Sequence, residues 1–195
     1  MACRRGNVVG NQQTKRKVFI SFYQGDRAEV ETFIDRWAAE EAVFIAKALG
    51  ALGNDDFIDS GNPAYVMTQI REKYLGDSTV TIVLVGSCTH SRRYVDWEIK
   101  SSLRRGTYTP NGLLGIILPS LGESAFLPPR FNDNWDKTEA NCYASYRVAP
   151  TSASQLGDWI EDAHGARTSQ ADLIVNHQEM WKYNRECKVH GDTHS

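Results

Sequence analysis

The stretch from Thr79 to Gly106 constrains the fold more than any other part of the chain. Its first part, 79–85, consists of β-branched and apolar residues without a charge, which is typical of a strand buried on both faces of a parallel sheet. Gly86 ends this strand, and small and polar residues follow it. From Tyr94 onward one apolar residue recurs every four positions, which predicts a helix packed on the sheet.

Glu98 stands out in this predicted helix. It precedes the apolar Ile99, about 100° around the helix from the buried stripe, and the aromatic Tyr94 and Trp97 lie within one turn of it. An open α/β sheet places its ligand crevice at the carboxyl ends of the strands. A carboxylate walled by two aromatic rings on the helix after a central strand is therefore a candidate site.

The rest of the chain alternates between strands and helices. Residues 17–22 (KVFISF) read as a buried strand, and a helical pattern starts at Asp26 and continues as far as Ala48, as one long helix or as two. Residues 57–59 suggest a brief strand, 65–74 a helix, and 113–118 another buried strand. This order predicts a doubly wound parallel sheet with helices on both faces and right-handed crossovers.

The domain organisation follows from the patterns outside this alternation. We expect a disordered arm at 1–16, a single domain at 17–188 with its core at 17–118, and a polar tail at 189–195. Residues 119–145 lack a period and read as a functional lid or a wrapping loop. Tyr146–Val148 suggest an edge strand. The C-terminal extension, 151–188, is predicted to hold two helices, one around Leu156–Ala163 and one around Leu173–Trp181.

Charge and cysteine usage narrow the class of protein. The chain of 195 residues has 22 basic and 24 acidic residues, so nucleic acid and anionic membranes are not expected partners. No stretch of eighteen apolar residues occurs, and the N-terminus has no apolar core of an export signal. Four cysteines, Cys3, Cys88, Cys142 and Cys187, are widely spaced without a CxxC pair. We therefore expect reduced thiols and a cytoplasmic protein.

Four segments together resemble a known family. KVFISF followed by Asp26, then TIVLVGSCT, RRYVDWEI and GLLGIIL are similar to the TIR-like family typified by the sensor subunit of the bacterial Thoeris anti-phage system. The resemblance covers residues 17–118, with weaker agreement beyond, and its most specific part is 80–99. The chain lacks the acidic-box sequence motif of animal TIR domains, and the residues after Trp37 depart from the family pattern.

The resemblance implies a flavodoxin-like fold and a reaction. TIR-like enzymes cleave the nicotinamide–ribose bond of NAD with a glutamate on the helix after the central strand, which Glu98 matches by position. Tyr94 and Trp97 match the aromatic shoulder beside that glutamate. The implied product is a cyclic or otherwise modified ADP-ribose that activates a partner effector. NAD would be the substrate and no cofactor is expected, since neither a GxGxxG nor a GxxxxGK fingerprint occurs.

The chemistry of this cleavage suits a carboxylate. Nicotinamide leaves NAD without the help of a metal because its ring is already cationic, and a carboxylate stabilises the positive charge that builds on ribose. The plainer interpretation is that Glu98 is a solvated helix residue paired with Arg105 or Ser102. With the resemblance, we favour the catalytic interpretation.

Other candidate ligand residues follow the first and the central strand. Phe22, Tyr23 and Asp26 end the first strand at the edge that carries the 87–91 loop, where they could line the pocket opposite Glu98. Asp26 with Arg27 would meet the ribose or the phosphates; equally, Asp26 could cap the next helix. Two interpretations also remain for the loop hydroxyls, as phosphate donors or as ordinary loop residues. These hydroxyls are Ser87 and Thr89, and Asp59 with Ser60 could flank the same pocket.

The remaining reactive side chains fit plainer roles. Cys187, His190 and His194 have a spacing that could hold a metal, but they lie in the polar tail, and we expect no metal. Cys88 reads as a small buried thiol rather than a nucleophile, although His90 is near in sequence. Two alternatives to an enzyme stay open: a non-catalytic module that self-associates or recruits a partner, and a sensor that binds an ADP-ribose derivative without cleaving it.

Overall fold

The computed structural model describes residues 15–49, 62–135 and 142–193, which form one five-stranded sheet with flanking helices. All neighbouring strands are parallel, in the order β2-β1-β3-β4-β5. Their bounds are β1 Lys17–Ser21, β2 Ile45–Leu49, β3 Val80–Val85, β4 Gly112–Ile117 and β5 Ala144–Arg147. This is the flavodoxin-like order. The chain adds β2 on one side of β1 and then β3, β4 and β5 on the other side, so the order in which strands are added reverses between β1 and β3. The predicted doubly wound sheet is confirmed, and β5 is the predicted edge strand.

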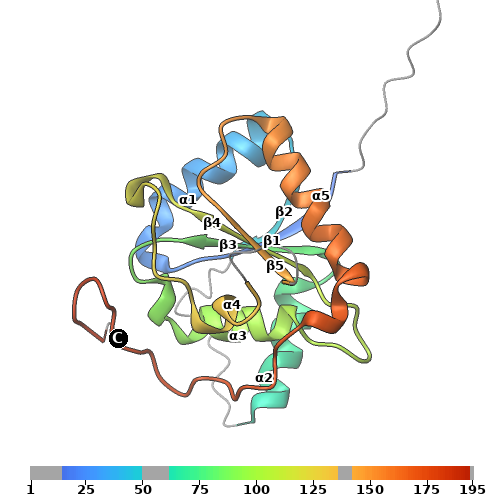
Figure 1. Ribbon diagram of the computed structural model, residues 1–195, viewed down its shortest axis with the longest axis vertical. Helices are drawn as coiled ribbons and strands as arrows, with labels where there is room; N and C mark the ends of the chain where they lie inside the picture. Colours follow the sequence, from blue (N-terminus) through green and yellow to red (C-terminus); the bar gives the residue numbers. More distant parts are fainter. Residues whose placement is uncertain (1–14, 50–61, 136–141, 194–195) are drawn as a thin grey trace, which may run out of the picture.

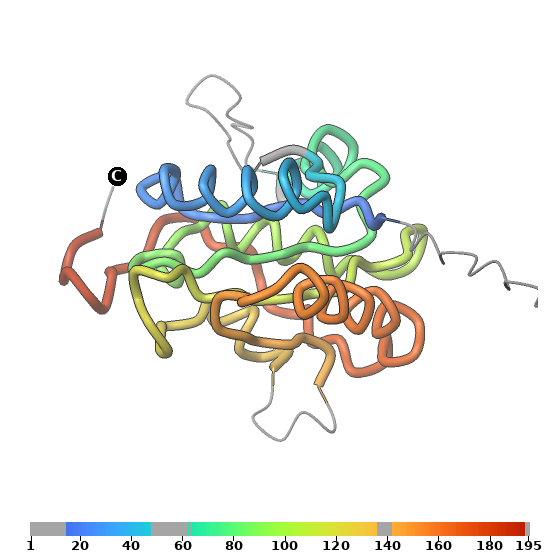
Figure 2. Tube along the Cα trace, turned by 90° about the horizontal axis from the view of Figure 1, so that it is seen from above, coloured from blue at the N-terminus to red at the C-terminus, as the bar shows by residue number. Residues whose placement is uncertain are grey.

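Helices cover both faces of the sheet (Figure 1). Their bounds are α1 Arg27–Ile34, α2 Pro63–Ile70, α3 Arg93–Ser102, α4 Pro129–Asn132 and α5 Ala153–Ser169. Helices α1 and α5 lie on one face, as the view from above shows (Figure 2), and α2, α3 and α4 lie on the other. Apolar residues of α1 and α5, including Phe33 and Ile160, join Val18 and Ile20 of β1 in one core cluster.

The central strands have the burial that their composition predicts. Every residue of β3 and of β4 is buried, because helices pack on both of their faces. Gly112 of β4 is required for this packing: a Cβ there would lie 1.9 Å from the carbonyl oxygen of Ala163 in α5. The glycine therefore sets how closely α5 approaches the sheet.

The helical structure predicted from Asp26 to Ala48, as one helix or two, is wrong in its second half. The helical region ends with a π-helical turn at Asp35–Glu40, and 45–49 form strand β2. Ala42 has a φ of 51°, which breaks the helix, and Ile45 pairs with Lys17 in the sheet. The apolar spacing around Phe44 suits a helix and a strand alike, so pairing with β1 decides the outcome. The brief strand predicted at 57–59 lies outside the described residues.

The second predicted C-terminal helix does not form. A 3-10 turn at Ala171–Leu173 follows α5, and the described residues 174–193, here called the C-terminal strap, form no further helix. In Figure 1 the strap passes below the sheet alongside α3 and returns to the edge where α3 begins. Backbone carbonyls of the strap accept hydrogen bonds from side chains of α3 and α4; for example, Trp97 Nε1 donates to the Trp181 carbonyl at 2.7 Å, and Arg130 Nη2 to the Glu179 carbonyl at 3.0 Å.

The strap also overturns the expectation of reduced thiols. Cys88, after β3, and Cys187, in the strap, form a disulfide across a sequence separation of 99 residues. The sequence did not indicate this pair, because the two cysteines are far apart in it and the strap brings them together only in the folded chain. Cys142 is a free, half-buried thiol.

The described segments 119–135 and 142–145 begin beside α1, where Ser120 bonds to Glu29, and continue to the α3 side of the sheet, where Phe131 and Tyr143 pack. They contain a 3-10 turn at Pro119–Leu121, helix α4 and the start of β5. Phe131 of α4 is fully buried and belongs to the core cluster that contains Val95 and Ile99 of α3. Among the described residues, no helix combines the length and apolar character needed to cross a bilayer.

Candidate active site

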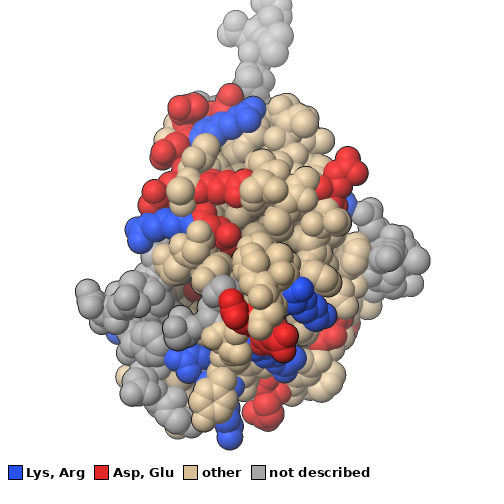
Figure 3. Space-filling model, turned by 90° about the vertical axis from the view of Figure 1, so that its left-hand side faces the viewer, with Lys and Arg blue, Asp and Glu red and all other residues tan. Residues whose placement is uncertain are grey.

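The carboxyl ends of β1 and β3 meet at one edge of the sheet. The two strands pair in register, with Ser21 opposite Val83, so the segments that follow them leave the sheet together. Helix α3 begins at this edge, which is on the left of Figure 1 and faces the viewer in Figure 3. Basic and acidic side chains both appear on this side of the molecule (Figure 3). This is the edge at which open α/β sheets bind ligands.

Glu98 lies behind this edge with its carboxyl group inside the protein. Only 3% of the residue is exposed, and the fully buried Ser21 donates a hydrogen bond from Oγ to Glu98 Oε2 at 2.6 Å. Alternation along β1 places Ser21 on the α3 side of the sheet, opposite the side of Ile20. The alternative pairing of Glu98 with Arg105 or Ser102 is wrong, because these two bond to other partners. Arg105 pairs with Asp172, and Ser102 with Thr81.

Burial changes the acidity of this carboxyl group. Removal from water raises the pKa of Glu98 to about 8, although the hydrogen bond from Ser21 acts in the opposite direction. A buried acid costs stability unless it is neutral or well paired. A strongly raised carboxyl pKa at a ligand-binding edge is a recognised signal of a functional group.

Asp26 and Thr89 form a second polar cluster at the same edge. The N–H of Gly86 donates to Thr89 Oγ1 at 2.9 Å, and Thr89 Oγ1 lies 3.4 Å from Asp26 Oδ2, to which it donates. Gly86 has no side chain, and a Cβ there would lie 2.1 Å from Asp26 Oδ2. Burial raises the pKa of Asp26 to about 6, with Thr89 and Arg92 lowering it and Glu29 raising it.

The capping interpretation of Asp26 is wrong. Asp26 does precede α1, but its side chain makes no capping bond to that helix. The carboxylate is directed instead over Gly86 and toward Thr89. Beside it, the guanidinium of the buried Arg92 lies 3.9 Å from the ring centroid of Tyr23. The structure thus brings Tyr23, Asp26 and Thr89 together.

The aromatic candidates are placed differently. Phe22 is 4% exposed and belongs to the core cluster of Val18 and Phe33, so the structure does not bring it to the α3 side. Trp97 and Tyr94 make an edge-to-face contact at 5.3 Å and pack with Phe19 and with α2. Their rings are held between α2 and the C-terminal strap.

The remaining candidates are Ser87, Arg27, Asp59, Ser60 and His194. Ser87 is half-buried, and its carbonyl lies 3.6 Å from Cys187 Sγ. Arg27 is exposed and pairs with Glu31 one turn along α1. Asp59 and Ser60 lie outside the described residues, as does His194.

Sequence reasoning missed three residues that shape this region. Ser21 is a polar residue at the end of the apolar KVFIS strand, a position where it could have been noticed. Asp96 and Arg130 are 2% and 1% exposed and form an ion pair at 2.8 Å. Asp96 also accepts from the Trp181 N–H at 3.2 Å, so this pair joins α3, α4 and the C-terminal strap. Nothing in the local sequence links positions 34 residues apart.

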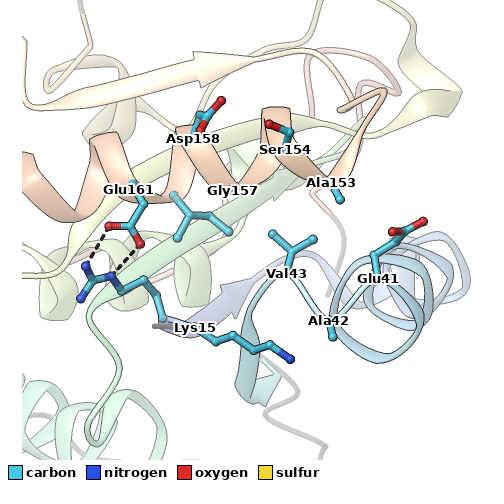
Figure 4. Close-up of a pocket in the computed structure, with 11 residues that line it drawn as sticks. Lys15, Glu41, Ala42, Val43, Ala153, Ser154, Gly157, Asp158 and Glu161 are labelled. Carbon is cyan, nitrogen blue, oxygen red and sulfur yellow. Dashed lines mark hydrogen bonds and ion pairs between the residues drawn. The ribbon is translucent and has the colours of Figure 1, made fainter. Parts of the chain in front are cut away.

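A separate pocket of about 360 Å³ lies at the other end of the sheet (Figure 4). It lies between the segments that lead into β1 and β2 and one side of α5, and the Arg16–Glu161 ion pair closes one end of it. These segments precede the strands, so the pocket lies at their amino ends. It is therefore not at the edge that holds Glu98, and we do not place the active site there.

Sheet order, helix placement and a buried glutamate on α3 define the class: this is a TIR-like α/β domain. Residues 19–123 match the family described as Thoeris protein ThsB, TIR-like domain, and the chain belongs to that family. This membership makes the chain a TIR-like protein related to defence. A comparison with curated proteins finds no match to the chain.

Proposed function

We propose that this chain is an enzyme that cleaves the nicotinamide–ribose bond of NAD, with Glu98 as the catalytic carboxylate. The observation that carries the proposal is the buried Glu98, hydrogen-bonded to Ser21 at the carboxyl edge of the sheet. Family membership supports it, since the match covers both Ser21 and Glu98. The proposed product is a cyclic or modified ADP-ribose that activates an effector protein in the cytoplasm of a phage-infected cell.

The proposed reaction breaks one C–N bond. The bonding electron pair moves onto the nicotinamide nitrogen, which neutralises that ring, and positive charge develops on the ribose. An ionised Glu98 beside the sugar would stabilise this charge in a site of low dielectric. Water, or a nucleophile within ADP-ribose, then attacks the anomeric carbon and loses a proton. The protein contributes position and electric field, and none of these steps needs a metal.

Ionisation of Glu98 is the step that substrate binding would favour. With a pKa of about 8, the free acid is mostly protonated at neutral pH. The cationic nicotinamide ring would lower this pKa when it binds nearby, because an opposite charge stabilises the carboxylate. The active form of the group would then appear mainly in the complex with substrate.

The binding roles of the other residues are part of the proposal. Tyr23, Asp26 and Thr89 already lie together, and we assign the ribose and phosphates of NAD to them and to the neighbouring Ser87. Tyr94 and Trp97 would lie beside Glu98, next to the nicotinamide base of the bound NAD. Phe22 would act through the packing of the edge rather than by touching NAD, given its place in the core.

The experiment compares Glu98→Gln, which keeps the shape of the side chain, with Glu72→Gln, a substitution of an exposed residue in the helical turn Arg71–Leu75 that follows α2. Nicotinamide release is measured with purified protein and in phage-infected cells that express the chain. We expect the parent and Glu72→Gln to release nicotinamide, and Glu98→Gln to do so roughly 100-fold more slowly. Equal rates for the parent and Glu98→Gln would refute the proposed role.

The low exposure of Glu98 favours a second candidate function. The carboxyl group of a residue that is only 3% exposed, bonded to Ser21, could hold α3 on the sheet in a non-catalytic module or a nucleotide sensor. Absence of nicotinamide release by the parent in both settings would support this candidate. Calorimetry with NAD and with ADP-ribose on Glu98→Gln would then separate a sensor, which binds one of them, from a module that binds neither.

A further inference from the structure

The C-terminal strap is fastened to the loop between β3 and α3 at successive points. Asn184 Oδ1 accepts from the Arg93 N–H at 3.0 Å, and the Arg185 N–H donates to the Ser91 carbonyl at 2.9 Å. The Lys188 N–H then donates to His90 Nε2 at 3.0 Å. These bonds involve neither cysteine, so the strap has contacts to this loop that do not depend on the disulfide.

Beyond these bonds, three metal-binding side chains converge. His190 Nδ1 lies 3.2 Å from Cys88 Sγ and 4.0 Å from Cys187 Sγ, and all three ligand atoms lie within 4.8 Å of one another. Both cysteines are fully buried, whereas His190 is exposed at the rim. Two sulfur atoms and one imidazole nitrogen form the donor set typical of zinc in proteins.

A closed turn holds two of these ligands in place. The Cys187 carbonyl accepts from the N–H groups of His190 and Gly191, at 3.2 and 2.7 Å, and the Cys187 N–H donates to the Asp192 carbonyl at 2.8 Å. Gly191 supplies the φ of 71° that this reversal requires. The third ligand, Cys88, belongs to a second turn, in which its carbonyl accepts from the Ser91 N–H. Two turns from distant parts of the chain therefore present the ligands to one point.

We propose that Cys88, Cys187 and His190 form a zinc site when the two cysteines are reduced, with one coordination position left for a further ligand. The same sulfur atoms cannot bind a metal and each other, so the disulfide and the zinc site are alternative states of one cluster. Either state fastens the strap to the loop that contains Thr89. Two thiolates and a neutral imidazole balance the charge of a divalent cation, which suits a buried position.

The disulfide state is converted to the zinc state in two steps, reduction and metal binding. A dithiol reductant gives two electrons and two protons to the Cys88–Cys187 disulfide and becomes a cyclic disulfide itself. Zinc then binds the two sulfur atoms and displaces their protons. Binding should therefore release about two protons per metal at a pH below the pKa of the thiols.

The test uses the full chain, reduced with dithiothreitol, freed of the reductant without air, and titrated with zinc against a coloured chelator. Cobalt(II) provides a second readout through its sulfur-to-metal absorption. The variants are Cys88→Ser, Cys187→Ser and His190→Ala, and Cys142→Ser is the matched control because this thiol lies outside the cluster. Near-ultraviolet circular dichroism of each variant checks that it is folded.

We expect the reduced parent and Cys142→Ser to bind about one zinc per chain, with sulfur-to-cobalt absorption. Loss of either cluster cysteine should weaken binding by more than about 100-fold, beyond the 10–100-fold typical of groups around the ligands. The oxidised parent should not bind at this site. Zinc binding by the folded Cys88→Ser and Cys187→Ser chains at parental affinity, or its absence from the reduced parent, would overturn the proposal. The readout is metal binding, so it is independent of whether the chain cleaves NAD.

Discussion

The Ser21 hydroxyl donates a 2.6 Å hydrogen bond to Glu98 Oε2, and the two residues are 0% and 3% exposed. One comes from the end of β1 and the other from α3, so the bond joins the sheet to the helix at the candidate active site. It is also the interaction that opposes the effect of burial on the Glu98 pKa. Its removal should therefore change chemistry more than architecture.

Ser21→Ala should raise the pKa of Glu98 further, because the hydroxyl stabilises the ionised form. If Glu98 acts as a carboxylate, kcat/KM for NAD will rise with pH through the pKa of the free enzyme, and in this variant the rise will shift to higher pH. A shift of one pKa unit would lower kcat/KM at neutral pH by about tenfold. The measurement is the pH profile of nicotinamide release, with Ser154→Ala as an exposed control. An unchanged profile would show that the hydroxyl does not tune the reacting group.

Glu98→Gln should change how stability depends on pH. The folded pKa of Glu98, about 8, is above its ordinary value of 4.5, so the proton favours the folded state. Stability from this group is fully present below pH 4.5, declines as pH rises above it, and is lost once pH passes 8. Glutamine cannot ionise, so the stability of the variant relative to the parent should rise between pH 4.5 and about 8 and level off above it. Urea unfolding at several pH values measures the difference, and a constant difference would contradict the raised pKa.

Gly112→Ala should destabilise the fold strongly. Its Cβ would lie 1.9 Å from the Ala163 carbonyl oxygen, and a backbone atom cannot move aside as a flexible side chain can. We expect a loss of about 1–3 kcal/mol or more in the free energy of unfolding. Gly165→Ala is the matched control, since nothing lies within 4 Å of the added Cβ in the same helix, α5. That variant should gain about 0.5–1 kcal/mol from helix propensity. Similar effects of the two substitutions would show that α5 does not contact β4 this closely.

Asp96→Ala should loosen the C-terminal strap. It leaves the buried Arg130 guanidinium without its carboxylate and removes the acceptor of the Trp181 N–H. Breaking a buried pair from one side costs about 3–5 kcal/mol. Hydrogen exchange should become faster at Trp181, whereas Asp172→Ala, which removes an exposed pair with Arg105, should change little. Unchanged exchange at Trp181 in Asp96→Ala would mean that other contacts hold the strap.

Much of this fold could be predicted from local pattern. The apolar run of β3, the four-residue spacing of α3 and the alternation with β4 lead to a parallel sheet, and the structure confirms it. Strand β2 was missed because the residues around Phe44 suit two periods, and only pairing with β1 decides between them. The second C-terminal helix was predicted from apolar spacing that serves packing on α3 instead.

The candidate site, too, could be predicted from the sequence only in part. Glu98 could be found from its place between a central strand and an apolar stripe, whereas its pairing with Ser21 could not, because the two are 77 residues apart. Asp26 had the pattern of a helix cap, yet its carboxylate lies over Gly86 of another strand's loop. In each case the deciding contact is not local in the sequence.

The sequence alone determined the alternation of strands and helices, the parallel sheet and the position of Glu98 on the helix after β3. Those features depend on periodic burial and turn chemistry, which act over a few residues. Only the tertiary structure decided the Ser21–Glu98 bond, the Asp96–Arg130 pair and the meeting of Cys88 with Cys187 and His190. These depend on how distant segments pack against one another, and a local pattern does not contain that information.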